Sequence, residues 1–142
     1  MIDLQKHRPL DRVPPHSIEA EQGVLGSVLW SAKQCLNECV VRFGQDEVWY
    51  DLRHQVIFKA MTELAHAMKP VEVVSVMQHL KDAGTLEQIG GIAYLSSLQD
   101  AVPSAANLSY YLDVMTEKAT ARKMIRLCET AMAKAYTAAE IG

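Results

Sequence analysis

The feature that most constrains the fold is a long uninterrupted stretch near the carboxyl end of the chain. Between Pro103 and Gly142 the sequence contains neither glycine nor proline, the two residues that most disfavour a helix interior. Ser104 or Asn107 is suited to cap its start. We therefore predict one helix over residues 107–138, about 45 Å long at roughly 1.5 Å per residue. A small helical domain cannot cover that length, so much of this helix should project and present apolar surface that needs a partner.

The predicted long helix carries its apolar residues in a broad and imperfect stripe. The stripe consists of Leu108, Leu112, Met115, Ala119, Met124, Ile125, Cys128 and Met132. Acidic side chains, Asp113 and Glu117, occupy the first half of the helix. Basic side chains follow at Lys118, Arg122, Lys123 and Arg126.

Three of these basic residues are spaced by four and form a row of like charge: Lys118, Arg122 and Arg126. One interpretation is a solvated face that is helped by the helix dipole. The other is a surface for an acidic partner, for example the acidic half of a second copy packed antiparallel. In that case Arg122 or Arg126 would meet the acidic pair of the neighbouring chain.

The residues before Pro103 show shorter helical patterns divided by glycine and proline. We predict helices over residues 17–30, 32–43, 52–68, 72–83 and 91–101. The third has the most regular buried face, with steps of three or four residues: His54, Ile57, Phe58, Met61, Leu64, Ala65 and Met68. The expected fold is all-α, a compact bundle of about five helices followed by a long projecting helix. We divide the chain into a flexible arm (1–16), a helical head (17–102) and the long helix (103–142).

The first predicted helix follows an extended di-proline segment. Ser17 is placed to cap its first turn, and Glu19 and Glu21 favour the amino end of a helix. Gly23 and Gly26 each lower helix propensity by roughly 1 kcal/mol relative to Ala. They are either simply tolerated or kept because another helix approaches closely.

Composition and motifs argue against chemistry within this chain. The net charge of −3 lacks the basic excess typical of a free-standing DNA binder. The glycines form no G-x-x-x-x-G-K-[ST] phosphate loop. Cys35 and Cys39 are interpreted as packed thiols and His54 as an interior histidine, so we expect no catalytic, cofactor-binding or metal-ligating residue. Three cysteines, with no signal peptide or membrane-length apolar run, favour a cytoplasmic location.

Four collinear motifs resemble the N-terminal domain of DnaB-type replicative helicases. They are P-P-H-S-I-E-A-E-Q-x-V-L-G-S from residue 14, L-R-H-Q-V-I-F-K-A from residue 52, G-x-L-x-x-I-G-G-x-A-Y-L-x-x-L from residue 84, and P-S-A-A-N-L from residue 103. The match covers about residues 12–137. The order and spacing of all four make the resemblance more specific than any one motif.

The resemblance implies an all-helical head followed by the first arm of a helical hairpin. In such helicases this region forms a collar that stabilises the hexamer and docks primase and, in some systems, a loader. ATP, Mg²⁺ and most DNA contacts belong to a separate motor domain, so the chain is expected to be a piece of an ATP-dependent DNA helicase. The candidate protein-contact residues are Tyr94, Tyr111, Asp113, Glu117, Lys118, Arg122, Ile125 and Arg126.

Two alternatives to this interpretation stay open. The helicase-interaction domain of a primase has a related helical fold, although the opening motif favours the helicase side. An autonomous nucleic-acid-binding helical module could use the basic residues between Lys118 and Arg126.

Overall fold

The computed structural model describes residues 12–141, and in this range it contains helices and no strand. The elements are α1 (Ile18–Trp30), α2 (Ala32–Phe43), α3 (Leu52–His66), α4 (Val73–Asp82), the 3₁₀-helix η3 (Glu87–Ile89), α5 (Gly91–Asp100) and α6 (Leu108–Ile141). The predicted all-α fold, a compact head followed by a long projecting helix, is confirmed. Most of the arm predicted over residues 1–16 lies outside the described residues.

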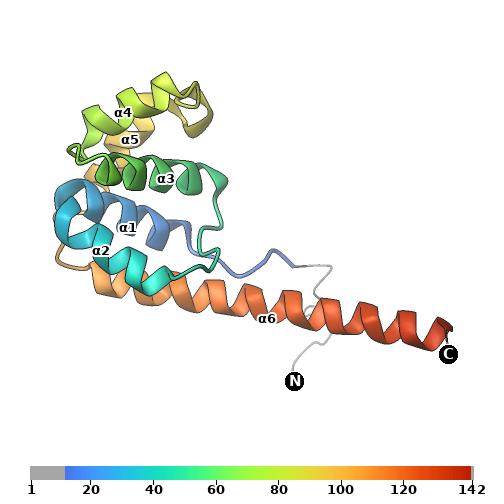
Figure 1. Cartoon of the computed structure of the whole chain (residues 1–142). Coiled ribbons are helices and arrows are strands. Elements are labelled where there is room, and N and C mark those ends of the chain that lie inside the picture. Colours follow the sequence, from blue (N-terminus) through green and yellow to red (C-terminus); the bar gives the residue numbers. More distant parts are fainter. Residues whose placement is uncertain (1–11, 142) are drawn as a thin grey trace.

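Helix α1 is the centre of the head. It packs against α2, α3, α5 and α6, and α4 packs against α3 and α5. Figure 1 shows α3, α4 and α5 above α1 and α2, while α6 runs beneath them and continues far beyond the head. Residues 23–29 of α1 are all buried, as a helix with neighbours on several sides requires.

Both glycines of α1 lie where other helices approach its backbone. A Cβ atom at Gly26 would collide with the carbonyl oxygen of Leu98 and lie 2.9 Å from Cγ2 of Val102. A Cβ atom at Gly23 would lie 2.6 Å from the ring of Tyr111, which belongs to α6. The close-approach interpretation of these glycines is therefore confirmed.

Helix α3 ends earlier than predicted. Its last residue is His66, and Met68 adopts the left-handed φ of 60°. The amide of Met68 donates to Ala65 O and that of Lys69 to Leu64 O, which closes the helix in a Schellman-type turn. Met68 was predicted on the buried face but is 92% exposed, because this turn carries it off the helix.

Only the first half of α6 is covered by the head. Its buried residues are Leu108, Leu112, Met115, Ala119 and Arg122. Their spacing of four and three keeps one side of α6 against α1 and α2. Every residue from 126 to 141 is exposed. Met124, Cys128 and Met132 thus do not extend the buried stripe as their spacing suggested; they lie on α6 beyond or away from the head.

Candidate functional site

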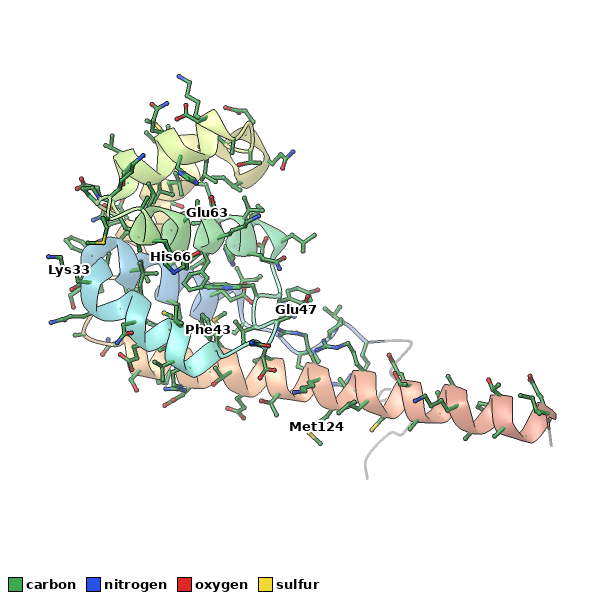
Figure 2. All side chains as sticks on the ribbon, in the orientation of Figure 1. Lys33, Phe43, Glu47, Glu63, His66 and Met124 are labelled. Carbon is green, nitrogen blue, oxygen red and sulfur yellow. The ribbon has the colours of Figure 1, made fainter. Side chains whose placement is uncertain are left out.

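The most conspicuous unpartnered surface is the exposed half of α6, residues 123–141, which we call the rod. Figure 2 shows Met124 on the side of α6 that faces away from the head. Residues in line with Met124 recur every three or four positions and form what we call the outer stripe: Ala121, Met124, Cys128, Ala131, Ala135 and Ala138. Small side chains at this spacing allow a second helix to pack closely.

Acidic residues continue this surface toward the head. A shallow hollow on the outer side of α6 is lined by Asp113, Glu117 and Met124, among others. Asp113 already has a partner in its own chain, because Arg42 Nη2 lies 2.6 Å from its Oδ1. Among the acidic contact candidates, Glu117 is the exposed one for which the structure shows no such ion pair within residues 12–141.

The basic candidates do not share one face. Arg126 lies two positions from Met124, and residues two apart on a helix point to nearly opposite sides. Arg126 therefore turns away from the outer stripe and lines a groove between α6 and the α2–α3 loop. Arg122 is buried, while Lys118 and Ile125 are partly exposed. The predicted row of three exposed cations is thus interrupted at Arg122.

The two tyrosines predicted as aromatic anchors are partly buried in the head. Tyr111 covers Gly23, and the hydroxyl of Tyr94 lies 2.6 Å from Nε2 of His54. Sequence reasoning missed Tyr110, which is 65% exposed on α6. Its position, two residues from both Leu108 and Leu112, was the signal that it would turn outward.

A buried carboxylate connects three helices inside the head. Glu21, 1% exposed, accepts hydrogen bonds from the amides of Tyr50 (2.7 Å) and Asp51 (3.2 Å). It also accepts from Nδ1 of His54 at 2.7 Å. Because His54 bonds Tyr94 through its other nitrogen, the network joins α1, α3, α5 and the α2–α3 loop. His54 is the interior, hydrogen-bonded histidine that the sequence predicted.

The three thiols of the chain differ sharply in environment. Cys35 and Cys39 are buried in α2, while Cys128 is exposed on the outer stripe. Burial raises the pKa of Cys39 to about 12 and also raises the pKa of Cys35. Since the thiolate is the reactive form, the two buried thiols should react slowly.

We expect a disulfide reagent such as DTNB, used at about pH 8, near the ordinary thiol pKa, to modify one thiol quickly and the others only after denaturation. Cys128→Ser should abolish the fast phase, whereas Cys35→Ser should leave it unchanged. Fast modification of two thiols in the folded protein would contradict the burial of α2.

Two features are absent from the part of the chain that the structure describes, residues 12–141. No group of three or more His, Cys, Asp or Glu side chains there is arranged to hold a metal ion. No helix there has the length and apolar character needed to cross a bilayer.

Comparison with known proteins places this helical head and its long final helix in one class, the amino-terminal domains of replicative helicases. Residues 13–117 match the family described as the DnaB-like helicase N terminal domain, and the chain belongs to this family.

Individual relatives agree with this assignment. The replicative DNA helicase DnaB of Geobacillus stearothermophilus is 41% identical over 127 residues, which is 89% of this chain and 28% of that protein. The replicative DNA helicase DnaC of Bacillus subtilis is 38% identical over the same shares. The crystal structure of the N-terminal domain of DnaB helicase from Mycobacterium tuberculosis superposes with a TM-score of 0.81 at 33% identity, covering 88% of this chain and 87% of that one. The chain therefore spans little more than a quarter of these two helicases but most of the isolated domain.

Proposed function

We propose that this chain serves as the amino-terminal assembly collar of a replicative DNA helicase. It holds copies together in the hexameric ring and offers a docking surface to primase and to a loader. Its own role is assembly and recruitment in the cytoplasm rather than catalysis. ATP, Mg²⁺, ATP hydrolysis and most contacts with DNA are assigned to other parts of such a helicase, because the chain contains no phosphate-binding loop.

The exposed rod is the observation that carries this proposal. Large apolar side chains on it stand in solvent, among them Met124 (61% exposed) and Leu127, Met132 and Tyr136. Large apolar side chains exposed in this number on one segment are typical of an interaction site. The outer stripe favours a second copy as the occupant, because one stripe of small residues on each rod is self-complementary when two rods pack about a two-fold axis.

Sedimentation velocity over a concentration series tests this contact. Met124→Lys places a charge in the outer stripe, at its largest side chain, and should weaken self-association at least about tenfold, because a buried charge in a helix seam is not compensated. Val74→Lys is the matched control, since it changes an exposed valine on α4 to the same residue. An unmodified protein that stays monomeric throughout, or a Met124→Lys variant that associates normally, would count against the outer stripe.

Sedimentation velocity also tests the ion pair between two chains that the sequence predicted. Arg122 and Asp113 already have partners in their own chain. The candidate ion pair between two chains therefore joins Arg126 of one to Glu117 of the other. Glu117 continues the outer stripe and Arg126 lies on nearly the opposite side of α6, so a contact between them would be separate from the two-fold packing of the outer stripes. Arg126→Glu should weaken association there, and Glu117→Arg in the same chain should restore it.

The nucleic-acid alternative has less support. The groove between α6 and the α2–α3 loop, about 350 Å³ in volume, brings together Arg42, Lys123 and Arg126. Two of these cations already pair with acids: Arg42 with Asp113, and Lys123 with Asp46 at 3.4 Å. Salt-sensitive binding of fluorescent single-stranded DNA by this chain would favour the alternative.

A further inference from the structure

Arg122 lies at the point where α6 leaves the head. It is 8% exposed and is the last buried residue of the helix. Its Nη1 donates to the carbonyl oxygen of Pro15 at 2.8 Å, and its Nη2 donates to that of Val48 at 3.0 Å. One guanidinium thus binds α6 to the segment before α1 and to the α2–α3 loop.

An aromatic ring lies beside the guanidinium of Arg122 and restricts the movement of the side chain. The ring centroid of Tyr50 lies 5.6 Å from Cζ of Arg122, and the same ring stacks on His16 at 4.0 Å. Burial lowers the pKa of Arg122. The negative charge of Glu21 opposes this shift, and the positive charge of Arg126 adds to it. A guanidinium stays charged in a protein even when burial lowers its pKa. Arg122 therefore keeps all of its N–H donors.

Most of the other contacts between α6 and the head are apolar. Leu108, Leu112, Met115 and Ala119 hold α6 against the head through apolar packing, which is non-directional. The ion pair of Lys123 with Asp46 is largely exposed and that of Arg42 with Asp113 is partly exposed, and surface pairs of this kind contribute little. Arg122 instead makes two directed, buried or partly buried hydrogen bonds at the end of the covered half.

We propose that Arg122 is a clasp that sets the direction of the rod relative to the head by binding the carbonyls of Pro15 and Val48 at once. With the clasp closed, the rod is a rigid extension of the head. With it open, the segment before α1 and the α2–α3 loop lose a shared anchor, α6 is held less firmly against the head, and the rod changes direction as α6 shifts on the head as a whole. This inference concerns a single chain and holds whichever partner the rod binds.

Pulsed electron–electron spin resonance between the head and the rod tests the clasp. In a Cys128→Ser background, spin labels are placed at Val74→Cys on α4 and Lys134→Cys on the rod, two exposed positions. Labelled protein is mixed with an excess of unlabelled chain, so that only distances within one chain are measured. The parent should show one narrow distance.

Arg122→Gln removes the charge and one arm of the clasp, and the distance distribution should broaden at least about twofold. Arg126→Gln is the matched control: it makes the same chemical change one turn further along, on an exposed residue, and should leave the distribution narrow. A distribution for Arg122→Gln that is as narrow as the parent's and has the same centre would overturn the proposal.

Arg122→Lys provides a second test of the proposal if the Arg122→Gln variant does not fold. It preserves the charge, but a single ammonium lacks the fork that spans two carbonyls. We expect normal helix content by circular dichroism, a broadened distance, and faster amide exchange in residues 12–16 and 44–51. A narrow distance with unchanged exchange in a folded Arg122→Lys variant would equally overturn the clasp.

Discussion

Glu21→Ala is expected to lower the free energy of unfolding by about 3 kcal/mol or more, because each buried donor left without its acceptor costs about 1–3 kcal/mol. Without the carboxylate, Nδ1 of His54 and the amides of Tyr50 and Asp51 lose their acceptor in the interior of the head. Buried donors without partners cost more than the hydrogen bonds themselves contribute. Urea denaturation followed by circular dichroism measures the loss.

Glu19→Ala is the matched control for this variant. Both residues lie in the first turn of α1 and favour the helix dipole, but Glu19 is exposed. The control should therefore lose well under about 1 kcal/mol, and the difference isolates the buried contacts. Equal losses in the two variants would show that the Glu21 network contributes little.

Gly26→Ala is expected to destabilise the head even though alanine is the better helix former. The propensity gain is about 1 kcal/mol. Against it, the new methyl group meets the backbone oxygen of Leu98, so α1 and α5 must separate. Overpacking of this kind costs about 1–3 kcal/mol, and the high end is expected because a backbone atom cannot rotate away. We expect a net loss of stability.

Gly23→Ala provides the comparison in thermal unfolding. There the obstacle is the ring of Tyr111, a partly exposed side chain and not a backbone atom, so the loss should be smaller. The parent should have the highest melting temperature, Gly23→Ala an intermediate one and Gly26→Ala the lowest. A Gly26→Ala variant more stable than the parent would mean that α5 moves away from α1 at little cost in free energy.

The helices were largely predictable because their determinants are local. Ser17 caps α1 as its position suggested, and Asp51 caps α3; their side-chain oxygens accept from Ala20 N and Arg53 N. The end of α3 was not predictable, because Met68 adopts a backbone conformation that is uncommon for any residue other than glycine. Nothing in the local pattern distinguishes such a methionine from one that continues the helix.

The candidate site was predictable in part. The length of α6 indicated that it would project, but its apolar residues occupy more than one side, so spacing alone did not show which side the head covers. Arg122 resembled its exposed neighbours because its acceptors are backbone carbonyls far away in the sequence, which leave no trace in residue type. Glu21 could have been found: it lies three, four and seven positions before Val24, Leu25 and Val28, on the buried side of α1.

The contact between Arg122 and Pro15 spans 107 positions and closes almost the whole described chain into one loop. Long-range closure of this kind has an entropic cost that only an already assembled interior offsets. The segment before α1 should therefore dock late in folding, after α1 and α6 have met. In the native protein, opening of the segment before α1 and loosening at the base of α6 should then occur together, so two segments far apart in the sequence share one local stability.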